Sequence, residues 1–128
     1  MIYFVSGHRN LTQEEFDNFY APKIDNIVNG DNCASFVVGD WEGLDSMFID
    51  YMSKFEDWEY GFITIYCVDK PRVEYQKLHN NVCIHCCSNY DECDASMTKD
   101  SDFDIAWIRP GRGDSHTALN IKRRYGLF

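Results

Sequence analysis

Short apolar segments that alternate with helical patterns constrain the fold of this chain most strongly. Four segments rich in β-branched and aromatic residues predict buried strands, over residues 1–6, 35–38, 62–68 and 103–108. Strands that alternate with helices are typical of a parallel sheet covered on both faces. We therefore expect an α/β fold, a three-layer Rossmann-like sandwich with a mainly parallel sheet. The 128 residues are enough for one domain with a single core.

The first helix has the clearest start signal. Thr12 and Glu15 form the Ser/Thr-x-x-Glu pattern of a capping box, and apolar residues then recur at helical spacing as far as Val28. Pro22 lies inside this run and should kink the helix or end it early. Further helices are expected over residues 42–55, 90–97 and 117–125, and a polar loop over residues 69–81.

The charge of the chain excludes some partners. The formal net charge is −9, which argues against binding to DNA or RNA because phosphate backbones are held by Lys and Arg. The basic run at 122–124 ends the last expected helix, where it offsets the helix dipole. No apolar run has the length of a membrane span, and residues 2–5 are too short for a signal peptide. We expect a cytoplasmic protein without a nucleic-acid or membrane partner.

The last strand–loop–helix turn is a candidate phosphate site. After the strand at 103–108 the chain is broken by Pro110 and two glycines, and a helix begins near Ser115. The first amides of a helix and the positive end of its dipole favour an anion. The predicted phosphate-binding residues are Arg109, Gly111, Gly113, Ser115 and Thr117, with Arg112 an equal alternative to Arg109. The simpler interpretation is that Asp114 or Ser115 only caps the helix.

A second glycine-containing turn follows the strand at 35–38. Because the carboxyl ends of parallel strands lie at the same edge of a sheet, the two turns should lie close together. A cleft there would bind a ligand through residues of this turn and of the loop after the first strand: Gly7, Arg9, Gly39, Trp41 and Gly43. Packing of Trp41 is the alternative to stacking on a base, and pairing with carboxylates is the alternative for Arg9.

Three residues near this cleft are candidates for catalysis. Asp40 and Asp45 can orient a ribose or assist a water molecule, and His8 can donate a proton to a leaving base. Helix capping is the alternative role of the two aspartates, since an acid in the first turn of a helix stabilises its dipole. An ordinary loop position is the alternative for His8.

A cysteine-rich segment, predicted to be a loop that leads into the helix at 90–97, raises the question of a metal. Cys83 and Cys86 form a CxxC pair, and Cys87 and Cys93 follow closely. Such a group could bind zinc, although a strong zinc signature would contain a second, well-separated pair. Free thiols, core packing or a bridge between two monomers are the alternatives. No other cofactor is expected.

Three motifs in this order resemble the SLOG superfamily, Rossmann-like domains related to the LOG-type cytokinin-activating phosphoribohydrolases. They are GHR after the first strand, VVGDWEGLDSMFIDYM from the second strand onward, and MTKDSDFDIAWIRPGRGDSHTALNI near the end. The chain looks most like the small bacterial and viral members, in which a GDARGAD-like loop follows the second strand. The resemblance spans most of the chain and weakens between Arg72 and Asn89.

The resemblance implies a cleft for a nucleotide or a nucleotide-derived ligand, and some family members hydrolyse the N-glycosidic bond of a nucleoside monophosphate. The glutamate of the family motif PGGxGTxxE falls on Asn120, which cannot accept a proton as a carboxylate does, so binding is favoured slightly over hydrolysis. Related domains often form homodimers. By position, the matches to the two family loops are Gly39, Asp40, Gly43 and Asp45, and Gly111, Gly113, Ser115 and Thr117.

A different class of function also fits the composition. The acidic surface and the cysteine-rich segment could serve a protein-interaction module that binds no nucleotide.

Overall fold

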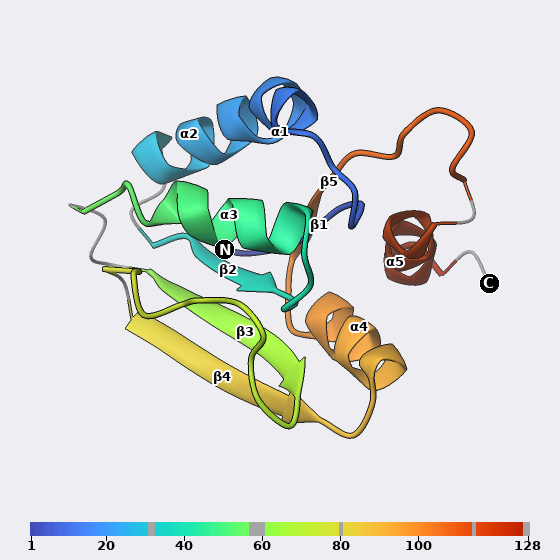
Figure 1. Ribbon diagram of the computed structural model, residues 1–128. Coiled ribbons are helices and arrows are strands. Elements are labelled where there is room, and N and C mark those ends of the chain that lie inside the picture. Colours follow the sequence, from blue (N-terminus) through green and yellow to red (C-terminus); the bar gives the residue numbers. More distant parts are fainter. Residues whose placement is uncertain (31–32, 57–60, 80, 114, 127–128) are drawn as a thin grey trace.

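The computed structural model describes residues 1–30, 33–56, 61–79, 81–113 and 115–126 (Figure 1). Strands and helices alternate along most of this length. The elements are β1 (Ile2–Ser6), α1 (Gln13–Phe19), α2 (Ala21–Gly30), β2 (Ser35–Val38), α3 (Leu44–Met52), β3 (Phe62–Val68), β4 (Asn81–Cys87), α4 (Tyr90–Lys99), β5 (Phe103–Ala106) and α5 (His116–Arg124).

The five strands form one sheet in the order β4-β3-β2-β1-β5, and all of the pairs are parallel. The chain moves outward from β1 to β4 on one side of β1, and α4 then carries it back to β5 on the other side. The direction of the strand order therefore reverses at β1. This arrangement confirms the predicted α/β fold with a parallel sheet.

Helices cover both faces of the sheet, which gives the three layers (Figure 1). On one face the side chains of α1, α2 and α3 pack in the larger core, for example Phe16, Ile24 and Phe48. On the other face α4 contributes Cys93 and Met97 to a smaller core. Along β1, β2 and β3 the buried residues are divided between these two cores, because successive side chains of a strand point to opposite faces.

Pro22 separates two helices as the sequence predicts. The helix α1 ends at Phe19 and α2 begins at Ala21, so the proline lies in the first turn of α2, where its missing N–H costs no helical hydrogen bond. The capping box is also present: Thr12 accepts the N–H of Glu15, and the Glu15 carboxylate accepts the N–H of Thr12.

The predicted cysteine-rich loop is wrong, because its residues form the strand β4. This strand pairs with β3 over its whole length, from Phe62↔Asn81 to Val68↔Cys87. Val82 and Ile84 do alternate as in a strand, but they are the only β-branched residues of the segment, and the CxxC pattern suggested a metal-binding loop instead. The crossover from β3 contains no helix in its described part, residues 69–79, and it lies on the face that also carries α3.

Tyr20 ties the carboxyl ends of two strands together. Its hydroxyl donates to the carbonyl of Ser6 (2.7 Å) and accepts the N–H of Trp107 (3.0 Å), and its side chain is fully buried. Burial raises the pKa of this phenol above its usual value. A Cβ atom at Gly7 would lie 2.6 Å from the hydroxyl, so only glycine leaves room for it there.

We predict that Tyr20→Phe lowers the free energy of unfolding by about 1–3 kcal/mol, because a buried N–H and a buried C=O lose their partner. Urea denaturation measures the change. The matched control is Tyr125→Phe at an exposed tyrosine, which should alter stability by less than about 0.5 kcal/mol. Equal losses in the two variants would contradict this role of Tyr20.

Candidate functional site

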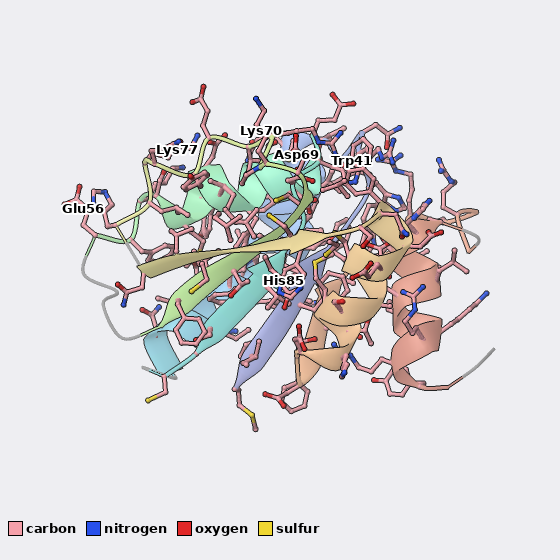
Figure 2. All side chains as sticks on the ribbon, turned by 90° about the horizontal axis from the view of Figure 1, so that it is seen from below. Trp41, Glu56, Asp69, Lys70, Lys77 and His85 are labelled. Carbon is pink, nitrogen blue, oxygen red and sulfur yellow. The ribbon has the colours of Figure 1, made fainter. Side chains whose placement is uncertain are left out.

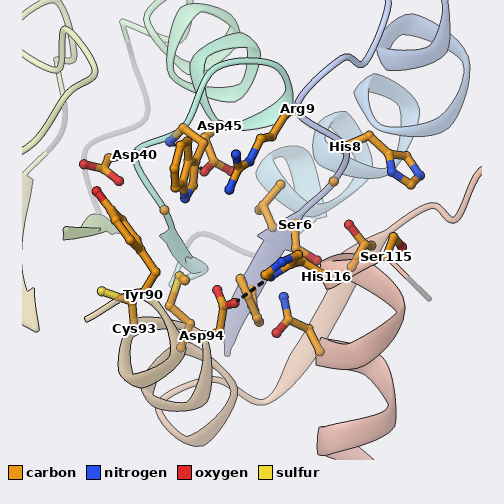
Figure 3. A pocket seen from close by; sticks show the side chains of 18 of the residues that line it. Ser6, His8, Arg9, Asp40, Asp45, Tyr90, Cys93, Asp94, Ser115 and His116 are labelled. Carbon is orange, nitrogen blue, oxygen red and sulfur yellow. Dashed lines mark hydrogen bonds and ion pairs between the residues drawn. The ribbon is translucent and has the colours of Figure 1, made fainter. Parts of the chain in front are cut away.

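A cavity of about 740 Å³ opens at the carboxyl ends of β1 and β2, between α4 and α5 (Figure 3). The strand order reverses at this place, and ligands bind at such reversals in open α/β sheets. The wall is built from the end of β1 and the loop after it, the β2–α3 loop, one face of α4 and the start of α5.

The cavity brings together many of the residues predicted from sequence. Those that line it are Gly7, His8, Arg9, Gly39, Asp40, Trp41, Asp45, Cys93, Ser115 and Thr117. Others are described but lie outside its wall: Gly43, Arg109, Gly111, Gly113, Cys83, Cys86 and Cys87.

Asp45 has the most perturbed carboxyl group of the cavity. It lies in the first turn of α3, and its Oδ2 accepts the N–H of Trp41 at 3.0 Å. A Cβ atom at Gly39 would lie 2.7 Å from the same oxygen, so this glycine gives the carboxyl group its space. Burial, with the charges of Asp40 and Asp94, raises the pKa of Asp45 to about 7. The group can therefore donate or accept a proton near neutral pH.

Asp40 is held in an ion pair that the sequence did not reveal. Its buried carboxylate accepts from the guanidinium of Arg72 at 3.3 Å and from the Arg72 backbone N–H at 3.2 Å. Arg72 belongs to the β3–β4 crossover, where no motif marks it. In this arrangement Asp40 anchors the crossover at the rim of the cavity.

Both faces of the Trp41 ring are covered. The guanidinium carbons of Arg9 and Arg72 lie 3.5 and 3.6 Å from the ring centre. Two such groups would overlap on one face, so they lie on opposite faces, as favourable cation–π contacts. In this arrangement Trp41 is packed, and a base can stack on it only if an arginine moves.

His8 and Arg109 contact each other, and of the two only His8 lines the cavity. The His8 Nε2 accepts the backbone N–H of Arg109 at 2.9 Å, and the Arg109 guanidinium pairs with Glu15 at 2.7 Å and with Asn10 at 3.0 Å. Burial and the charges of Arg109 and Arg112 lower the pKa of His8. The imidazole is therefore neutral, its Nε2 has no proton to donate, and its ring points away from the cavity aspartates (Figure 3).

The start of α5 forms one wall of the cavity. Ser115 caps this helix through a hydrogen bond from the N–H of Ala118 to its Oγ (3.2 Å), and Thr117 is buried beside it. The predicted cap is thus confirmed for Ser115, and Asp114 lies outside the described residues. Gly111 and Gly113 have open space around them and shape the loop that precedes the helix.

Sequence reasoning missed several residues of the cavity. The buried hydroxyl of Ser6 has no hydrogen-bond partner within the described part of the chain. The carboxylate of Asp94 lies 3.5 Å from Nδ1 of His116, and burial raises the pKa of Asp94. Tyr90, Asp94 and Met97 face the cavity from α4, beside Cys93, which was predicted only as a metal ligand. Their i, i+3, i+4, i+7 spacing was a readable signal, since such residues share one helix face.

The strand β4 separates the two cysteines of the CxxC pair. Successive residues of a strand point to opposite faces, so Cys83 and Cys86 of the CxxC pair lie on different faces of the sheet. Within the described residues there is no group of three or more potential ligands, and Cys83, Cys86, Cys87 and Cys93 form no disulfide.

No family model, curated protein or solved structure matches this chain. The likeness to the SLOG superfamily therefore stays a prediction that rests on the sequence motifs. Among the described residues, no helix combines the length and the apolar character that crossing a membrane requires.

The raised pKa of Asp45 predicts that the stability of the protein depends on pH. An unfolded aspartate has a pKa of about 3.9, so the folded protein, in which the Asp45 pKa is about 7, binds this proton more tightly. The free energy of unfolding of the wild type should therefore fall as the pH rises from about 3.9 to about 7. The amide oxygen of Asp45→Asn can still accept the Trp41 N–H. Above pH 7 this variant should be more stable than the wild type, by roughly 1–3 kcal/mol when solvent in the cavity is taken into account.

Chemical denaturation at a series of pH values measures this difference. Asp91→Asn, which removes an exposed carboxylate from α4, is the control and should keep the pH profile of the wild type. Parallel profiles for Asp45→Asn and the wild type would contradict the assignment.

Proposed function

We propose that this chain binds a nucleotide or a nucleotide-derived ligand in the cavity, with a phosphate group at the start of α5. The observation that carries the proposal is the position of the Ser115-capped helix start, which lines a cavity where the strand order reverses. Helix amides and the positive end of the helix dipole attract an anion at such a place. Ser6 also lines the cavity, and its buried hydroxyl has no hydrogen-bond partner within the described residues.

Two arginines of the cavity support an anionic ligand. Arg9 and Arg112 line it from the loops after β1 and β5, and neither forms an ion pair within the described residues. Acidic residues outnumber basic ones by 21 to 12, so surface arginines have many carboxylates available to them. Guanidinium groups left without an acid can bind a phosphate through two parallel hydrogen bonds.

The acidic side of the cavity suits the sugar of such a ligand. Asp45 and Asp94 project from α3 and α4, and their oxygens can accept hydrogen bonds from ribose hydroxyls. The volume of about 740 Å³ falls within the range of roughly 300–1,000 Å³ that is usual for small-molecule sites. A cationic side for phosphate and an acidic side for sugar favour a nucleotide over a simple inorganic anion.

The raised pKa of Asp45 favours a second candidate function, hydrolysis of the N-glycosidic bond of a nucleoside monophosphate. Water would add across the bond, giving the free base and a ribose phosphate. Asp45 would protonate the departing base or take the proton of the water. Asn120 stands in the cavity wall at the position of the family glutamate, so Asp45 would have to replace that carboxylate.

Binding is tested by thermal shift with a panel of nucleoside mono-, di- and triphosphates. A ligand at a hundred times its Kd adds about 2.7 kcal/mol of stability, which raises Tm by several degrees for a domain of this size. Arg112→Gln should reduce the shift strongly. Lys23→Gln is the control, because it makes the same change in charge on α2, outside the cavity wall, and should leave the shift intact.

A panel without any shift would contradict nucleotide binding and favour the interaction module. Equal loss of the shift in the arginine and lysine variants would show that overall charge is responsible and not the cavity.

Hydrolysis is tested by chromatography of the free base released from the nucleotide that gives the largest shift. Asp45→Asn should lower base release by about a hundredfold or more, as expected for the loss of a general acid or base, while the thermal shift persists. Release that is unchanged in this variant would exclude Asp45 from the reaction.

A further inference from the structure

The edge strand β4 lacks the features that normally protect an edge. It ends the sheet next to β3 (Figure 2), it has 7 residues, and its sequence, NVCIHCC, contains no charged residue and no proline. Alternate residues of a parallel strand direct both the N–H and the C=O to the same side, so β4 presents a row of backbone groups away from β3. Such an edge is a template for another strand.

The opposite edge of the same sheet is protected. The strand β5 has only 4 residues, and one of them, Asp104, pairs with Arg124 of α5 at 2.6 Å. A short strand that carries a charge is a poor template for pairing. The two edges of one sheet thus differ in length and charge, and the difference points to use of the β4 edge.

Charge indicates which partner fits this edge. A chain of net charge −9 repels its own copies over most of its surface. The uncharged strand β4 is a place where two copies can approach without setting carboxylates against each other. Ile84 adds an apolar side chain there that is 39% exposed.

We propose that β4 pairs antiparallel with β4 of a second copy, so that two five-stranded sheets join into one continuous sheet across a two-fold axis. An axis perpendicular to the sheet keeps α1, α2 and α3 of both copies on the same side. Residues that are paired across the two-fold axis must then have their side chains on the same side of the sheet. The axis can therefore pass through Cys83, Ile84 or His85. The register centred on Ile84 places the two exposed isoleucines against each other, where they stabilise the pair.

This dimer is independent of the proposed ligand site, because no β4 residue lines the cavity. Both cavities stay open in the dimer. The failure of either proposal would leave the other standing.

Sedimentation velocity of the whole chain, in reducing buffer and over a wide range of concentration, tests the dimer. The wild type should change from monomer to dimer as its concentration rises. Ile84→Lys places a charge on the edge, as natural edge strands do, and should weaken dimerisation at least tenfold. The control is Phe103→Lys, which makes the same change in charge at a residue of β5 that is 48% exposed, and it should dimerise like the wild type.

Hydrogen exchange of the wild type gives a second measurement that needs no variant. Amides of residues 81–87 should exchange more slowly in the dimer, and those of β5 should not change. A chain that stays monomeric at every concentration would overturn the proposal. So would a well-folded Ile84→Lys that dimerises like the wild type, or slower exchange on another surface. Binding of an unrelated extended peptide to β4 in a monomeric chain would also overturn it, by identifying a different occupant.

Discussion

Parallel pairing of β1 with both β2 and β5 is the constraint on which the rest of the structure depends. It turns the carboxyl ends of the strands toward one edge of the sheet and makes the strand order reverse at β1. The chain leaves β1 toward α1 on one face of the sheet and leaves β5 toward α5 on the other face (Figure 1). The cavity is a consequence of this topology, and α4 and α5 form its sides because they cover the same face.

The walls of the cavity are held by contacts that leave little freedom. Tyr20 fixes the ends of β1 and β5, and Asp45 fixes the β2–α3 loop through the N–H of Trp41. Arg72 fixes the β3–β4 crossover through Asp40. Gly7 and Gly39 are small because a Cβ atom would collide with these same contacts. Residues that resemble a ligand motif in sequence are thus partly explained by packing. The case for a ligand depends on Ser6, whose hydroxyl has no hydrogen-bond partner among the described residues, and on Arg9 and Arg112, which form no ion pair there.

The fold could be predicted from sequence because strand and helix periodicities are local signals. Thr12, Pro22 and Ser115 mark helix boundaries by rules that act within one turn, and each marks one in the structure. The strand β4 was missed because its cysteines carry no clear strand preference. The site was predictable only in outline. Sequence placed the loops at one edge, but not the partners of Arg109 or Asp40, since those ion pairs join residues far apart in the chain.

The most direct test of a phosphate-binding cavity is amide chemical-shift mapping by NMR during titration with a nucleoside monophosphate. The account predicts saturable shifts that are largest at residues 6–9 and 115–118, where the end of β1 meets the start of α5. Shifts confined to other parts of the chain, or none at high ligand concentration, would contradict it.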